Sequence, residues 1–232
     1  MDTKQRPVSR VLQLAFSGAM AVGLYAMLDA SASYLDPGAL HPFYLDKLPL
    51  ARPQLWLTAL YVHVPSALLS LPACLLLSAA WPRRRWPRLH RWVGRFAGVL
   101  VVFAAVPSGL YLAFFAEGGW PSTLGFLLTS VITLVAMLKS VTAVRAGHVA
   151  AHRRYSTHVT AQLSVAVSSR ILLFGADLIE LREPWVFAAA LWLPVLTSVA
   201  LAECVARPHT NATSKGTCHE SLALARSVHV VR

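Results

Sequence analysis

Six long apolar runs constrain the fold of this chain more than any other feature. A membrane-spanning α-helix needs about 20 predominantly apolar residues, and each run meets or approaches that length. Charged residues make up 13% of the chain, about half of the roughly 25% that soluble domains carry. The pattern therefore predicts an all-α integral membrane bundle of six transmembrane helices. The expected helices cover residues about 11–29, 54–80, 91–116, 122–144, 152–177 and 184–206.

The segments outside the bundle are short and polar. Residues 1–10 form a basic N-terminus, residues 11–206 the membrane domain, and residues 207–232 a basic tail. The basic start and the sequence Ala30-Ser31-Ala32 are also typical of a secretory signal peptide. The apolar part of such a peptide spans about 7–15 residues, and this one is longer. A retained first helix is therefore favoured over a cleaved one.

The distribution of Lys and Arg predicts the orientation in the membrane. The segment WPRRRWPRLHRW places Arg83, Arg84, Arg85 and Arg88 between the second and third helices. If the N-terminus is cytoplasmic, sixteen of the 21 Lys and Arg residues fall on the cytoplasmic side. The positive-inside rule then favours six helices with both termini cytoplasmic. The net charge of +11 indicates contact with the lipid bilayer and its anionic headgroups, and no nucleic-acid binding.

Histidines on three helices are the main candidates for chemistry. His63 lies inside the second helix, His90 opens the third, and His152 and His158 lie on the fifth. His148 precedes the fifth helix, one turn before His152. Ionisable groups within membrane helices are functional candidates. Facing imidazoles can hold a haem or a transition metal. The alternative is that these histidines contact headgroups or hydrogen-bond to neighbouring helices.

Depth in the membrane decides which histidines can share a site. His63 is expected roughly 22 Å from the plane of His90, so the two cannot ligate one haem iron. His90 can pair with His152 or His158 near the cytoplasmic face. A weaker option is a transition-metal site formed by His90, His148 and His152. An outer haem on His63 has no second helical histidine, which leaves His41 in the loop or Met27 of the first helix, a soft ligand.

Arg170 is an unusual charge within the fifth helix. A guanidinium at that depth needs carboxylate, carbonyl or water partners. A tether to Asp29 is favoured over a ligand role, in which Arg170 receives a haem propionate, a quinone oxygen or a phosphate. Gln162, one turn after His158, extends a polar lining along this helix. No hydrolase or nucleotide-binding motif occurs, so the sequence does not support a hydrolase or a nucleotide-driven function. Whether the protein is another kind of enzyme stays open.

Three segments resemble a bacterial family of predicted membrane proteins of unknown function (DUF2306-like). They are LHRWVGR at 89–95, GLYLAFFAEGGW at 109–120 and AAHRRY at 150–155. The resemblance implies a multi-pass protein of the bacterial cytoplasmic membrane. His63, His90, His152 and Arg170 match positions that recur in this family. Tyr155 and His158 depart from its pattern, where tryptophan and a basic residue are expected.

The segment LHRWVGR also resembles, more weakly, a stretch of transmembrane b-type cytochromes. That likeness implies haem b, with His90 as an axial ligand. One hypothesis is therefore a b-type electron-transfer protein, whose cofactor-binding residues are His63, His90, His152, His158 and Arg170. The alternative is a cofactor-free transporter, or a membrane assembly or interaction protein.

Overall fold

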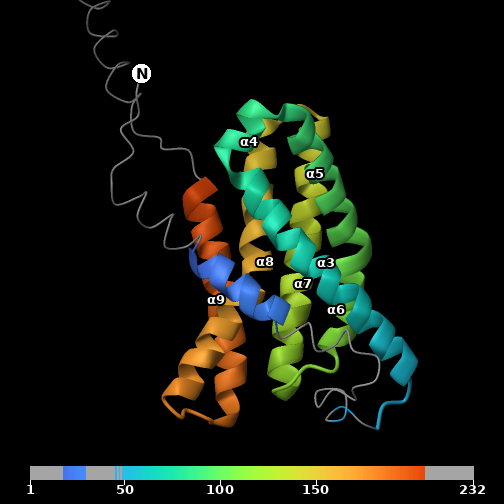
Figure 1. The fold of residues 1–232 in the computed structure, drawn as a ribbon, viewed down its shortest axis with the longest axis vertical. Coiled ribbons are helices and arrows are strands. Elements are labelled where there is room, and N and C mark those ends of the chain that lie inside the picture. Colours follow the sequence, from blue (N-terminus) through green and yellow to red (C-terminus); the bar gives the residue numbers. More distant parts are fainter. Residues whose placement is uncertain (1–17, 30–44, 46, 48, 207–232) are drawn as a thin grey trace, which may run out of the picture.

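The computed structural model describes residues 18–29, 45, 47 and 49–206. Helices dominate this part of the chain, and they stand side by side as an elongated bundle (Figure 1). They are the Gly18–Asp29 helix, α3 (Pro53–Ser78), α4 (Ala80–Arg85), α5 (Pro87–Leu100), the π-helix η2 (Val101–Ala105), α6 (Val106–Ala113), α7 (Gly119–Arg145), α8 (Val149–Leu178) and α9 (Pro184–Ala206).

Five helical segments are long and apolar enough to cross a membrane. They are α3, the continuous rod of α5, η2 and α6, then α7, α8 and α9. This confirms an all-helical, multi-pass architecture. Of the predicted first helix, the structure describes only the Gly18–Asp29 part, which is shorter than a full span. Residues 11–17 lie outside the described residues, so the sixth span and the side of the termini stay predictions.

Three helices begin three or four residues earlier than the sequence pattern predicts: α5, α7, which starts at Gly119 rather than at residue 122, and α8. The third span starts at Pro87 rather than at residue 91, because proline is well suited to the first helical position. The fifth span starts at Val149 rather than at residue 152. His90 and His152 consequently lie within the first turns of their helices. The arginine-rich segment before Pro87 forms a short helix of its own, α4.

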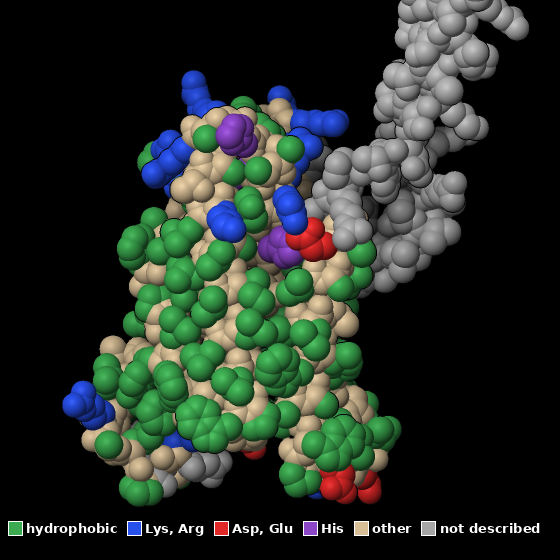
Figure 2. Space-filling view, turned by 180° about the vertical axis from the view of Figure 1, so that it is seen from behind, with side chains coloured by type: hydrophobic (Ala, Val, Ile, Leu, Met, Phe, Trp, Pro, Cys, Tyr) green, Lys and Arg blue, Asp and Glu red, His purple; other side chains and the backbone are tan. Residues whose placement is uncertain are grey.

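Charge divides the bundle into two ends. Lys and Arg side chains gather mainly at the end that holds α4, and hydrophobic side chains cover a broad band beyond it (Figure 2). We call this the basic end, and the opposite one, where α6 leads into α7 and α8 into α9, the far end. A band of exposed apolar side chains between charged ends is the surface expected of a membrane protein.

Small and apolar residues hold the helices together. α7 packs against α6, α8 and α9, and α3 packs against α5, η2, α6 and α8. The Gly18–Asp29 helix joins the bundle through Met20, which is buried with Leu71 of α3 and Val167 of α8. This helix therefore lies against the α3–α8 side of the bundle, where it forms part of the wall described next.

Candidate functional site

A cavity of about 420 Å³ lies in the half of the bundle toward the far end. Its volume is within the range of roughly 300–1,000 Å³ typical of small-molecule sites. The walls are mostly apolar and come from the Gly18–Asp29 helix, α3, η2, α6, α7, α8 and α9. The polar residues that line it are His63, Glu117, Thr129, Ser130, Thr133, Gln162, Ser169 and Arg170.

The orientation of His63 is fixed by the π-helix η2. Its Nδ1 lies 2.9 Å from the carbonyl oxygen of Ala105, the last residue of η2. A carbonyl can only accept, so we assign the ring proton to Nδ1, and Nε2 carries the lone pair of the neutral ring. Ser108 Oγ, 3.3 Å from Nδ1, donates to the carbonyl oxygen of Ala104. π-Helical turns are frequent at functional sites, and here one positions a cavity-lining histidine.

Gly109 makes room for the His63 ring against α6. A Cβ atom at position 109 would lie 2.8 Å from His63 Cε1 and 3.1 Å from Nδ1. Both separations are shorter than ordinary van der Waals contact, so any side chain there would displace the ring. The glycine in the segment GLYLAFFAEGGW therefore has a packing reason that involves His63.

Gln162 lines the cavity and holds a buried acceptor atom. Its side chain is buried at 1% exposure, and Nε2 donates to Ser198 Oγ at 2.9 Å. The Ser198 hydroxyl gives its own proton to the Val195 carbonyl oxygen, so toward Gln162 it acts as an acceptor. This fixes which end of the amide is nitrogen. Oε1 is buried and has no hydrogen-bond partner among the described residues.

Two hydroxyl groups and a guanidinium complete the polar lining. Thr129 Oγ1 and Ser169 Oγ are buried and lack a hydrogen-bond partner within the described ranges. Arg170 Nη1 donates to the Ala166 carbonyl oxygen at 3.0 Å, and the guanidinium is close enough to His63 for an electrostatic interaction. His63 and Arg170, which the sequence analysis selected separately, therefore belong to one cavity. The tether from Arg170 to Asp29 stays a prediction.

The basic end holds a second group of histidines. His152 Nδ1 lies 2.9 Å from Ser140 Oγ and 3.0 Å from the Ser140 carbonyl oxygen. His90 is within electrostatic range of His152, and its Nδ1 is buried without a partner in the described part of the chain. His148 is exposed at the start of α8. In the described ranges no three His, Cys, Asp or Glu side chains are grouped to hold a metal ion.

His158 is engaged by a residue that sequence reasoning missed. Its Nε2 lies 2.9 Å from Glu203 Oε1. Arg154 Nη2 also contacts this carboxylate, at 2.8 Å from Oε1 and 3.0 Å from Oε2. The three side chains join α8 to α9 near the basic end. This contact therefore gives His158 a partner on α9, and no contact between His158 and His90 is seen.

A family model described as predicted membrane protein (DUF2306) matches residues 60–206, well over half of the chain. The chain belongs to this family. No curated protein and no solved structure matches this chain. The matched region of this DUF2306 protein contains all cavity-lining residues except Leu24, Met27 and Trp56.

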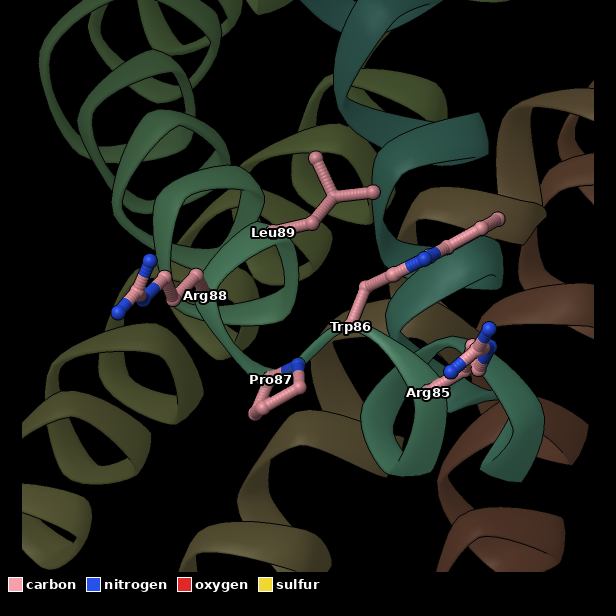
Figure 3. Close-up of a pocket in the computed structure, with 5 residues that line it drawn as sticks. All are labelled: Arg85, Trp86, Pro87, Arg88 and Leu89. Carbon is pink, nitrogen blue, oxygen red and sulfur yellow. The ribbon is translucent and has the colours of Figure 1, made fainter.

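The DUF2306 protein also has a shallow hollow at its basic end, between α4 and α5. Arg85 and Trp86 lie on the α4 side of it and Arg88 points away on the other side (Figure 3). All of its lining residues are exposed, so it is open surface rather than an enclosed site. Arg and Trp are typical of the headgroup level of a membrane. We therefore take the deeper cavity between the helices, near the far end, as the candidate functional site.

Proposed function

We propose that this multi-pass membrane protein binds a small, mainly apolar molecule in the cavity between its helices. One observation carries the proposal: three residues that line one mostly apolar cavity each hold a buried oxygen atom without a partner among the described residues. These atoms are Gln162 Oε1, Thr129 Oγ1 and Ser169 Oγ. A buried polar atom left unpaired costs about 1–3 kcal/mol. A ligand that supplied partners would remove that cost.

The surroundings of the cavity favour a ligand of low polarity. Most of the wall consists of side chains such as Trp56, Leu71 and Leu191, which gain from contact with an apolar body. The few polar groups converge from α3, α7 and α8 and would fix the ligand's orientation. This supports the cofactor-free alternative, a transporter or a ligand-dependent membrane factor.

A phenylalanine in the cavity is expected to exclude the ligand. Ala166 lines the cavity on α8 between Gln162 and Arg170, so Ala166→Phe places a ring in the binding volume. Small molecules extracted from the purified protein would be identified by mass spectrometry. The bound compound should fall at least about tenfold, because the loss of roughly 1.4 kcal/mol suffices for that change.

The matched control is Ala189→Phe, an exposed alanine on α9 that does not line the cavity. It should leave the amount of bound compound unchanged. Equal amounts in the wild type, Ala166→Phe and Ala189→Phe, or none in any of them, would contradict a ligand in this cavity.

Haem b is the second candidate occupant, and the geometry of His63 favours it. Metal-ligating histidines commonly donate the other ring N–H to a carbonyl or carboxylate, as His63 Nδ1 does to Ala105. Met27 and Arg170 line the same cavity and would supply a soft ligand and a partner for a propionate. A bound haem would supply one-electron redox chemistry to the protein.

A reduced-minus-oxidised visible spectrum of the purified protein tests the haem candidate. If haem occupies the cavity, its bands appear in the wild type and disappear in His63→Ala. Bands lost in His90→Ala instead would place haem at the basic end, with His90 and His152. A colourless protein after expression with ample haem supply would contradict both arrangements.

A further inference from the structure

We infer that the molecule bound in the cavity carries a hydroxyl group on an apolar skeleton, as a lipophilic alcohol or phenol does. The hydroxyl proton would be received by His63 Nε2 or Gln162 Oε1. This inference rests on the proposed function, since it names the chemical class of the ligand for the same cavity. The inference follows from two lining residues, His63 and Gln162, each of which has a ring or amide atom that can only accept a hydrogen bond.

The first acceptor is His63 Nε2. The proton of the neutral ring is committed to the Ala105 carbonyl oxygen at 2.9 Å, so Nε2 presents a lone pair. Ser108 does not change this assignment, because its hydroxyl proton goes to the Ala104 carbonyl oxygen. Since His63 lines the cavity, a ligand that approaches Nε2 is best matched if it brings a proton.

The second acceptor is Gln162 Oε1. The amide is locked by its bond to Ser198 Oγ at 2.9 Å, and Ser198 in turn donates to the Val195 carbonyl oxygen. If the amide were flipped, Gln162 Oε1 would face Ser198 Oγ, and neither oxygen could donate to the other. Oε1 is thus held as an acceptor and is buried without a partner among the described residues, on a residue that lines the cavity. Only a donor on the ligand can satisfy it.

The remaining polar groups do not favour an anion. Arg170 is one positive charge in the cavity lining, and Glu117 is a negative charge in the same lining. One guanidinium nitrogen of Arg170 is already bonded to the Ala166 carbonyl oxygen. A carboxylate close to His63 would have to face the lone pair of Nε2, which cannot donate to it. An alcohol oxygen accepts as well as donates, so it also suits a lining that carries the hydroxyl groups of Thr129 and Ser169.

Matched probe pairs test this chemistry with the full-length protein in detergent. Equilibrium dialysis against protein-free micelles would compare para-hexylphenol with its methyl ether, para-hexylanisole, and decanol with its methyl ether. Each ether keeps the skeleton and loses the proton. We expect the hydroxyl compound of at least one pair to bind about tenfold more tightly than its ether, the ratio that one buried hydrogen bond supports. The carboxylate para-hexylbenzoate should bind more weakly than the phenol.

Two variants connect the preference to the named acceptors. Gln162→Met and His63→Phe each remove one acceptor while keeping side-chain bulk, and at least one should reduce the tenfold preference to near unity. Thr197→Ala, on an exposed face of α9 outside the cavity, should leave it unchanged. Having two variants keeps the test decisive if either fails to fold.

The outcomes separate this inference from the proposed function. Probes that bind with no difference between hydroxyl and ether would overturn the hydroxyl inference and leave the cavity as a ligand site. Preferred binding of para-hexylbenzoate would overturn it in favour of an anion held by Arg170. A preference that survives in both acceptor variants would overturn the residue assignment. Binding of none of the probes would count against the proposed function itself.

Discussion

Replacing Trp56 by alanine is expected to lower the free energy of unfolding by about 3–5 kcal/mol, the cost typical of removing a large buried aromatic side chain. Trp56 lies in the first turn of α3, is 1% exposed and forms part of the cavity wall. Its removal would join a new void to a cavity of about 420 Å³, which packing cannot easily refill. Equilibrium unfolding of the detergent-solubilised protein measures the loss.

Trp120→Ala is the matched control for this substitution. Trp120 lies at the start of α7 near the far end and is 70% exposed, so its replacement should change the stability by no more than about 0.5 kcal/mol. Equal losses in the two variants would mean that Trp56 is not a buried wall of the cavity. Trp56→Phe should lose much less stability than Trp56→Ala, because phenylalanine keeps an aromatic ring in the cavity wall.

The apolar runs were sufficient to predict a helical membrane bundle, because length and hydrophobicity alone decide whether a helix can cross a bilayer. Five described segments confirm this prediction. The apolar runs predicted the ends of the helices less closely, because a single proline can decide where a helix begins. Pro87 opens α5 and brings His90 inside the helix, whereas the sequence pattern predicted a start at about residue 91.

Contacts between distant helices could not be read from the sequence. Glu203 holds both Arg154 and His158, yet nothing near it on α9 marks it as their partner. The partner of His63 is a backbone carbonyl in a π-helix, and backbone partners leave no residue-type pattern. Gln162 and Arg170 were recognised as unusual, but the cavity that joins them requires the packing of several helices.

Glycine spacing gave an incomplete picture of where helices approach closely. Gly94 and Gly98 form a GxxxG pair, a pattern associated with close helix packing. A Cβ at either position would have its nearest neighbour at 4.0 Å, so neither glycine is required by space. At Gly125 of α7, which belongs to no such motif, a Cβ would lie 2.7 Å from Leu191 Cδ2 of α9.

Gly125→Ala is therefore expected to destabilise the protein, by about 1–3 kcal/mol for overpacking, partly offset by the gain in helix propensity of roughly 1 kcal/mol. Leu191 is 2% exposed and cannot move away without disturbing the core. Leu191→Ala alone should cost about 2–5 kcal/mol through the void it leaves. In the double variant the new methyl group enters that void, so the loss should be smaller than the sum by about 1–2 kcal/mol.

Gly175→Ala provides a control of opposite sign, because a Cβ at that position of α8 meets no atom within 4 Å. It should leave the stability unchanged or raise it by up to about 1 kcal/mol. Strict additivity of Gly125→Ala and Leu191→Ala would show that the two residues do not touch, and with that the contact between α7 and α9 beside the cavity would be wrong. A loss in the double variant that is smaller than the sum would instead show that Gly125 and Leu191 are in contact. The contact between α7 and α9 beside the cavity would then stand.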